Sequence, residues 1–156
     1  MSKSLKRVMA ALTVAGITPR VMETPFETRT AGQAALAAGC LTDQIAKSII
    51  FRGLDCGHVI LFITAGGNQV DPSRAGQVAG EPLGKADADL IRAETGFAIG
   101  GVAPIGHLNP VSAFFDPRLL DFEQIWAAAG TPRHIFPIAP DRLLALSGAR
   151  IADFTA

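Results

Sequence analysis

Two runs of β-forming residues, 45–51 and 58–65, place the strongest constraint on how this chain can fold. They are separated by six residues, RGLDCG, whose glycines and aspartate are typical of a turn. Along the first run, IAKSIIF, successive side chains alternate between the two faces of a strand. The sequence therefore predicts a β-hairpin formed by these two runs.

Short helices and further strands are predicted on both sides of the hairpin. Residues 1–16 have apolar side chains at helical spacing, with a serine to cap the start and Gly16 to end the helix. Thr30 and Gln33 have the T-x-x-Q spacing of a capping box, which opens a helix over 31–38 that Gly39 ends. Further helices are expected over 72–78, 87–95 and 140–148. Further strands are expected over 20–26, 97–100, 111–115, 134–138 and 150–154. Segment 122–128 fits either a strand or a helix.

The order of these elements indicates the fold class. Strands and helices interleave irregularly, with hairpins in place of regular βαβ repeats, and neither an internal repeat nor an interdomain linker is visible. The 156 residues are enough for one hydrophobic core. We expect one α+β domain over 1–156, built on a mixed, curved or barrel-like β-sheet with flanking helices.

Composition excludes several classes of protein. The 14 basic and 14 acidic side chains cancel, which disfavours a protein that binds duplex DNA by neutralising its phosphates. No apolar run approaches the roughly 20 residues needed to cross a bilayer. Lys6 and Arg7 interrupt the apolar part of the N-terminus, which argues against a signal peptide and for a cytoplasmic protein. Cys40 and Cys56 form no CxxC pair and are expected to be reduced thiols.

Motifs for cofactors, metals and nucleophiles are missing from the sequence. The segment GEPLGK, 80–85, resembles a phosphate loop but lacks its first glycine and its final Ser or Thr, so a flexible connection is expected there. Cys56 and His58 are not accompanied by a second ligand pair, and they fit a turn better than a metal site. There is no G-x-S-x-G elbow for a serine nucleophile. We therefore expect neither a cofactor nor a metal.

Lys47 is a charge on an apolar strand face. Alternation places it with Ile45, Ile49 and Phe51. A lysine there is compatible with an edge strand, where its charge opposes aggregation. It is equally compatible with a pocket that receives an anionic or carbonyl-rich ligand. The strand pattern leaves both interpretations open.

The segment FAIGGVAPIGH, 97–107, brings little side chain and two adjacent glycines to one loop. Glycine suits a turn that needs a positive φ, and it equally suits a place where a ligand must approach the main chain. The segment itself does not decide between these two interpretations.

Three segments together resemble the YbaK family, the free-standing relatives of the editing domain of bacterial prolyl-tRNA synthetases. TRTAGQAALAAGCLTDQIAKSIIF is similar to the family's helix and lysine-bearing strand, and ETGFAIGGVAPIGH to its glycine loop, whose G-x-x-x-P signature falls on Gly100 to Pro104. Order and the spacing of about fifty residues between lysine and loop agree with the family. The tail, 122–154, resembles the family's ending, so the resemblance covers about 24–154.

The resemblance implies an aminoacyl-tRNA deacylase that acts in trans on wrongly charged tRNA, typically tRNA for proline. It contacts the acceptor end of the tRNA, and a transient contact with the synthetase is compatible with it. A non-catalytic module that only binds the tRNA end or an aminoacyl-nucleotide is the alternative. The substrate amino acid stays open.

The resemblance also implies roles for individual residues. Gly100 and Gly101 would let the substrate reach backbone N–H groups that stabilise an oxyanion, Pro104 would stiffen the loop, and Lys47 would bind the terminal phosphate or the carbonyl region. No side chain is assigned as general base, because family members are thought to position water with backbone groups and the 2′-hydroxyl of the tRNA. His134 falls near a histidine of the family's editing domains, although a turn residue is an equal alternative. The other expected substrate-binding residues are Phe26, Thr30, Ile49, Phe51, Val102 and Ala103.

Overall fold

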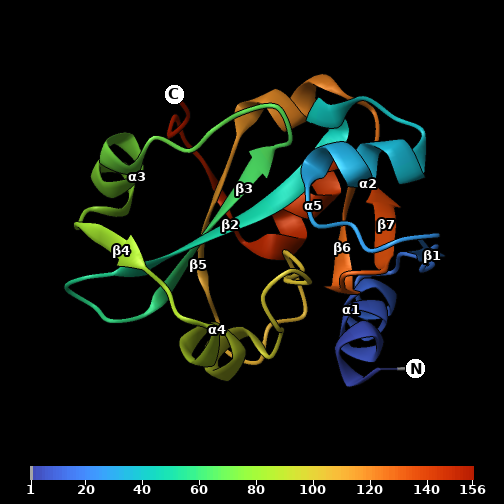
Figure 1. The fold of residues 1–156 in the computed structure, drawn as a ribbon, viewed down its shortest axis with the longest axis horizontal. Helices are drawn as coiled ribbons and strands as arrows, with labels where there is room; N and C mark the ends of the chain where they lie inside the picture. Colours follow the sequence, from blue (N-terminus) through green and yellow to red (C-terminus); the bar gives the residue numbers. More distant parts are fainter. Residues whose placement is uncertain (1) are drawn as a thin grey trace.

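The computed structural model describes residues 2–156, which form one eight-stranded mixed sheet with helices packed around it (Figure 1). The strands follow the order β1-β7-β6-β2-β3-β5-β8, and β4 pairs with β2 beside this path. The path runs from β1 at one end to β8 at the other, so the sheet is open. The predicted α+β class, a mixed sheet with flanking helices, is confirmed.

The predicted hairpin forms the centre of the sheet. Strands β2 (Ile45–Gly53) and β3 (Val59–Ala65) are antiparallel, with partners from Ala46 and Ala65 at one end to Arg52 and Val59 at the other. On its other side β3 pairs in parallel with β5 (Ser112–Phe115), which pairs in parallel with β8 (Arg150–Ile151). All seven residues of β3 are buried, as expected for a central strand.

The other half of the sheet separates from β2 after only two residue pairs. Strand β6 (Ile125–Thr131) runs parallel to β2 and pairs with it only at Ile45–Trp126 and Ala46–Ala127. It continues into the antiparallel strand β7 (His134–Ile138), which pairs with β1 (Met22–Glu23). Strand β4 (Leu83–Lys85) rejoins β2 at its far end. Between these two contacts β2 and β6 diverge (Figure 1), and this divergence positions the candidate site.

Local sequence signals explain the helices. Helix α1 (Lys3–Val14) is capped by the Ser2 hydroxyl, which accepts from the N–H of Leu5. Helix α2 (Ala31–Ala38) has the predicted capping box of Thr30 with Gln33. The remaining helices, at the other predicted places, are α3 (Pro72–Ala79), α4 (Ala88–Thr95) and α5 (Pro140–Ser147). Met1, the first residue of the predicted helix 1–16, lies outside the described residues.

Alternation along β3 divides the apolar core between the two faces of the sheet. Leu61 and Ile63 belong to the main cluster, which includes α1 and the fully buried Phe97. Ile60 and Phe62 belong to a second cluster beneath α3. Each such buried side chain contributes about 1.5–3 kcal/mol to folding.

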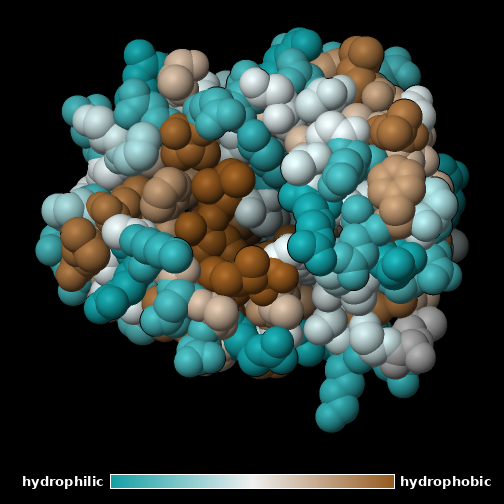
Figure 2. All heavy atoms as spheres, viewed as in Figure 1, coloured by the Kyte–Doolittle hydropathy of each residue, from teal (hydrophilic) through white to brown (hydrophobic). Residues whose placement is uncertain are grey.

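On the face drawn in Figure 2, a band of apolar side chains lies over the middle of β2 beside hydrophilic side chains to its right.

Several predicted strands are wrong or shorter than expected. Residues 97–100 form a loop, because Gly100 has φ +92° and the N–H of Gly101 donates to the carbonyl of Ala98 at 3.2 Å, which makes a turn. Segment 20–26 keeps only β1, since Pro25 has no N–H to donate, and 150–154 keeps only β8. Segment 122–128 is a strand, shifted to β6. The expected flexible connection at 80–85 contains β4.

Candidate functional site

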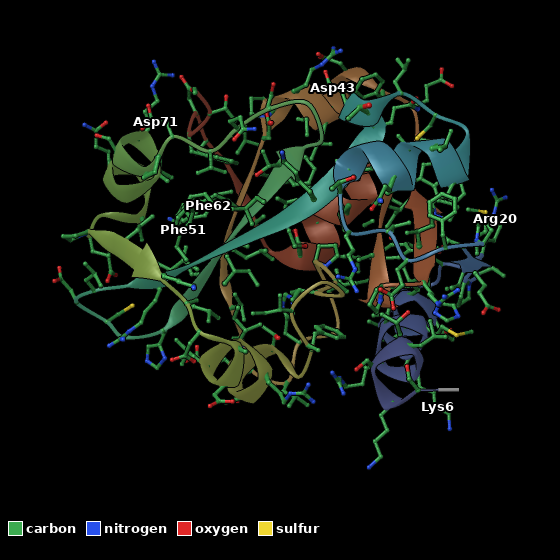
Figure 3. All side chains as sticks on the ribbon, in the orientation of Figure 1. Lys6, Arg20, Asp43, Phe51, Phe62 and Asp71 are labelled. Atoms are coloured by element: carbon green, nitrogen blue, oxygen red, sulfur yellow. The ribbon has the colours of Figure 1, made fainter. Side chains whose placement is uncertain are left out.

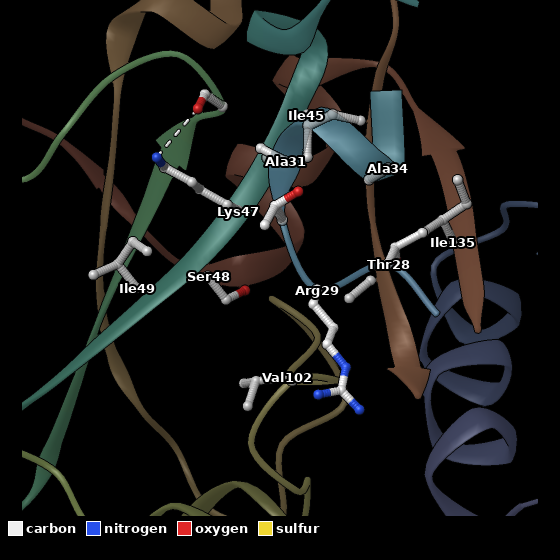
Figure 4. Close-up of a pocket in the computed structure, with 16 residues that line it drawn as sticks. Thr28, Arg29, Ala31, Ala34, Ile45, Lys47, Ser48, Ile49, Val102 and Ile135 are labelled. Atoms are coloured by element: carbon white, nitrogen blue, oxygen red, sulfur yellow. Dashed lines mark hydrogen bonds between the residues drawn. The ribbon is translucent and has the colours of Figure 1, made fainter. Parts of the chain in front are cut away.

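A cavity of about 470 Å³ opens where β2 and β6 diverge (Figure 4). The segment before α2, the first turns of α2, strand β2 and the glycine loop form its walls, and single residues of β6 and β7 complete them. The lining residues are Thr28, Arg29, Thr30, Ala31, Gly32, Ala34, Ile45, Ala46, Lys47, Ser48, Ile49, Gly66, Gly100, Val102, Ala128 and Ile135.

The cavity contains only some of the residues that the sequence suggested. Lys47, Thr30, Ile49, Gly100 and Val102 line it. The candidates that do not line it are Phe26, Phe51, Gly101, Ala103, Pro104 and His134. Segments that are more than fifty residues apart in the sequence therefore meet here, as the glycine loop and the lysine-bearing strand were expected to do.

Lys47 lies on an internal strand, so the edge-strand interpretation of this residue is wrong. Strand β2 pairs with β3 on one side and with β6 and β4 on the other, and Lys47 lies in the gap between the last two. Its Nζ donates to the carbonyl of Gly66 at 3.2 Å. Burial lowers the pKa of Lys47, whereas the carboxylates of Asp43 and Asp116 act in the opposite direction. The ammonium thus faces the cavity with one donor used and two donors left.

The two adjacent glycines have different environments. Gly100 is exposed and has φ +92°, and a Cβ there would have no atom of the described residues within 4 Å. Gly101 is buried, and a Cβ there would lie 2.8 Å from Cα of Thr131. The close approach that requires a glycine at 101 is therefore to the backbone of β6.

The glycine loop contains backbone donors without an acceptor among the described residues. The N–H of Gly101 is used by the turn to Ala98. Within residues 2–156 the N–H groups of Gly100 and Val102, both cavity residues, donate to no acceptor. Unsatisfied donors of this kind, fixed by the fold, can stabilise a developing negative charge.

The glycine loop is held in place from behind by α1 and by a histidine. Arg7 donates to the carbonyls of Gly96 at 2.7 Å and Gly106 at 3.3 Å, so one side chain of α1 fastens both ends of the loop. His107 Nε2 bonds the carbonyl of Ala103 at 2.7 Å. Burial lowers the pKa of His107, and the nearby Arg7 charge adds to this, against the effect of the bond to Ala103. The neutral imidazole, donating from Nε2, is the form that this environment favours.

Ser48 is a cavity residue that sequence reasoning missed. Its Oγ is buried and has no hydrogen-bond partner among the described residues. Alternation placed Ser48 on the face opposite Lys47, yet both line the cavity because β6 has left the side of β2 at this point. The other cavity residues that the sequence did not suggest are Arg29, Ala31, Gly32, Ala34, Gly66, Ala128 and Ile135.

Three aromatic candidates have other contacts. Phe51 packs its ring against Phe62 with centroids 5.8 Å apart, so it belongs to the second core cluster (Figure 3). Phe26 is half-buried, and its carbonyl accepts from the hydroxyl of Thr24. His134 Nδ1 lies 2.6 Å from the hydroxyl of Thr131 across the β6–β7 turn. The turn interpretation of His134 agrees with this contact.

The charge of the cavity differs from that of the whole chain. The chain has a formal net charge of +0, but the described residues that line the cavity include two cations, Arg29 and Lys47, and no carboxylate. Its remaining surface is largely alanine, valine and isoleucine. Such a cavity suits a ligand with an anionic part and a small apolar part.

No group of three His, Cys, Asp or Glu side chains within 2–156 lies close enough together to hold a metal ion. Over the same residues, no helix is long and apolar enough to cross a membrane.

The open mixed sheet and the cationic cavity at its divergence define a small α+β domain of the editing-domain fold. Residues 26–146 match the sequence profile of the aminoacyl-tRNA editing domain, and the chain belongs to this family.

Individual relatives agree with the family in sequence and in structure. A crystal structure described as a candidate trans-editing enzyme for prolyl-tRNA synthetase superposes with a TM-score of 0.91 at 44% identity, over 100% of this chain and 99% of that one. A scaffold used for computational epitope grafting gives a TM-score of 0.91 at 41% identity, with the same coverage. The uncharacterized protein YwhH of Bacillus subtilis (strain 168) is 31% identical over 130 residues, which is 82% of each chain.

Proposed function

We propose that this protein hydrolyses the ester of mischarged aminoacyl-tRNA in trans, with tRNA for proline carrying a small wrong amino acid as substrate. The observation that carries the proposal is that Lys47, Gly100 and Val102 line one cavity without carboxylates, and that the N–H groups of Gly100 and Val102 donate to no acceptor within residues 2–156. An aminoacyl ester has a carbonyl for these donors, and the nucleotide that bears it is anionic. The similarity to the candidate trans-editing enzyme supports the same assignment.

The reaction needs little covalent participation by the protein. Water adds to the ester carbonyl, the bond from the carbonyl carbon to the ribose oxygen breaks, and the proton of the water passes to that ribose oxygen. Negative charge develops on the carbonyl oxygen, which the N–H groups of the glycine loop would stabilise by hydrogen bonds, while the ammonium of Lys47 contributes a positive charge from the β2 wall. An activated ester can be hydrolysed by positioning and fixed dipoles.

The proton acceptor comes from the substrate or from water. The described residues that line the cavity include neither a histidine nor a carboxylate. The ribose 2′-hydroxyl next to the ester, together with ordered water, fills this role in the proposal. Ser48, whose buried hydroxyl has no partner in 2–156, is suitably placed to bind a polar group of the ester region.

The wall between α2 and β6 accounts for a small acyl group. Ala31, Ala34 and Ala128 contribute only methyl groups, and Ile45 and Ile135 close this side of the cavity. A hydrophobic pocket of fixed size discriminates by about 10- to 200-fold for each methylene. We infer that the side chain of the amino acid packs against this wall. We also infer that the protein acts in the cytoplasm, where charged tRNA accumulates, and that its contact with the synthetase is transient.

The test is deacylation of tRNA for proline charged with alanine, cysteine, serine or 2-aminobutyrate, with the protein at sub-stoichiometric concentration. We expect multiple turnovers on at least one of these substrates, and loss of turnover in Lys47→Ala. Lys85→Ala, which changes an exposed lysine on β4, is the matched control and should retain activity. Tight binding of every substrate without turnover would replace the enzyme by a non-catalytic binding module.

A further inference from the structure

The second cation of the cavity is Arg29, which lies at the opening. Its side chain is 77% exposed, whereas Lys47 is half-buried. Figure 4 shows Arg29 extending from the segment before α2 toward the loop that carries Val102, on the other side of the opening from Lys47. The two charges therefore occupy different depths, and they suit different parts of one ligand.

Arg29 is oriented before any ligand binds. Its Nε and Nη2 both donate to Oε2 of Glu27, at 3.1 and 2.8 Å. These bonds and the charge of Arg29 lower the pKa of Glu27, so its carboxylate stays ionised and keeps its hold on the guanidinium. Nη1 has no acceptor within residues 2–156. The free edge of the guanidinium is the one that Glu27 does not touch.

The backbone that carries Arg29 is fixed at both ends. The N–H and the hydroxyl of Thr28 donate to the carbonyl of Pro132 at 2.8 and 3.0 Å. The N–H of Arg29 itself donates to Oε1 of Gln33 at 2.8 Å, within the first turn of α2. The segment thus joins the β6–β7 turn to the helix start. The backbone from which Arg29 extends therefore needs no further ordering when a ligand binds.

We propose that Arg29 binds the phosphate on the 5′ side of the terminal adenosine, while Lys47 serves the acyl end of the substrate. This assignment rests on the proposed function. A guanidinium presents planar, paired donors that match phosphate oxygens, and at an exposed position it can reach a group that stays outside the cavity. Lys47 is half-buried and its ammonium donates to Gly66 inside the cavity, so it suits the acyl end and not a phosphate outside the opening. Within residues 2–156, Glu27 is the one carboxylate paired with this arginine, and it is held on the opposite edge of the guanidinium.

The experiment compares two ligands that differ by one phosphate. The first is the non-hydrolysable amide 3′-alanylamino-3′-deoxyadenosine, and the second is the same compound with a 5′-phosphate. Calorimetry on the whole protein should show that the phosphate tightens binding by about 10-fold or more, the size of one charge-assisted contact. Arg29→Ala should bind both ligands as the wild type binds the first. For intact tRNA, the slope of the logarithm of the binding constant against the logarithm of the salt concentration should be smaller by about one in the variant, because one phosphate contact is lost.

Arg133→Ala is the matched control. Arg133 also acts on the charge of Glu27, but it does not line the cavity, so this variant should keep the gain from the phosphate. If Arg29→Ala weakened the binding of both ligands equally, the assignment would be overturned. It would also be overturned if the 5′-phosphate still increased the affinity of the variant as much as it does in the wild type. A wild-type protein without any phosphate gain would also overturn it. An Arg29-dependent gain in a protein that hydrolyses no aminoacyl-tRNA would support the phosphate site and refute the hydrolase.

Discussion

Lys47 donates from its ammonium to the carbonyl of Gly66, 3.2 Å away, and so joins the first part of β2 to the residue that follows β3. The carbonyl orients the ammonium without neutralising its charge. Asp43 and Asp116 influence Lys47 but form no salt bridge with it within 2–156. The charge therefore remains available to a ligand in the cavity.

Lys47→Ala should lower single-turnover deacylation by about 10-fold or more, which corresponds to about 1.4 kcal/mol of transition-state stabilisation. The fold should persist, because the lysine is only half-buried and its removal leaves one carbonyl that water can reach. Rates on mischarged tRNA and thermal melting of the same preparation measure the two effects. A folded variant with the wild-type rate would remove Lys47 from the site.

Gly100→Ala and Gly101→Ala should separate activity from stability. At Gly101 the methyl would meet the backbone of Thr131, which cannot shift easily, so we expect a loss of about 1–3 kcal/mol in unfolding free energy. The deacylation rate per folded molecule of Gly101→Ala should be nearly unchanged.

At Gly100 the methyl would meet no protein atom within 4 Å and would enter the space at the cavity. The methyl group would keep the ester away from the backbone N–H groups, so we expect the rate per folded molecule to fall about 100-fold, comparable with loss of one oxyanion donor, together with a cost in stability from the positive φ. Denaturant titration and single-turnover kinetics on both variants give the comparison. Equal rates per folded molecule at the two positions would contradict the role of the loop.

Ile135→Val should shift substrate preference toward larger acyl groups, because it removes one methyl group from the wall proposed to hold the amino acid side chain. The ratio of the rates for 2-aminobutyryl- and alanyl-tRNA should rise by about 10-fold, within the range expected for one methylene. Ile138→Val makes the same change on the same strand outside the cavity, in a buried residue of the main cluster, and should leave the ratio unchanged. The same ratio in both variants would show that Ile135 does not contact the acyl group.

Acidification should destabilise the protein through His107. Burial lowers the pKa of His107 in the folded state below its ordinary value of 6.5, so the unfolded chain binds more protons in this range. The stabilisation is therefore present above about pH 6.5 and is lost as the pH falls toward the depressed folded pKa, by at most about 1.4 kcal/mol per pH unit. His107→Gln keeps a donor for the Ala103 carbonyl but does not titrate, so its unfolding free energy should depend less on pH between 7.5 and 5.5. Identical pH dependences in the two proteins would show that His107 is not the group responsible.

Much of the fold could be predicted from the sequence because its signals are local. The capping box of Thr30 with Gln33 places α2, and the turn between 45–51 and 58–65 places the hairpin. These signals need only a few neighbouring residues to act. The strand expected at 97–100 shows their limit, since an apolar run before two glycines fits a strand end and a loop anchored by one buried side chain, Phe97, equally well.

The cavity itself could not be read from local signals. Alternation assigned Lys47 and Ser48 to opposite faces of one strand, and both line the same space only because β6 leaves β2 after two residue pairs. In the same way, two adjacent glycines differ because only one of them lies against Thr131.

By itself the sequence determined the helices, the central hairpin, the lysine and the glycine loop, since capping, alternation and turn chemistry act within short stretches of chain. Only the tertiary structure decided which of these residues share a cavity and which face the core. Phe51 and Ile49 show the difference: both lie on the strand face predicted to wall the pocket and both pack against the second core cluster, but only Ile49 also lines the cavity. The physical reason is that a cavity arises where packed elements fail to meet, and this depends on contacts between residues far apart in the chain.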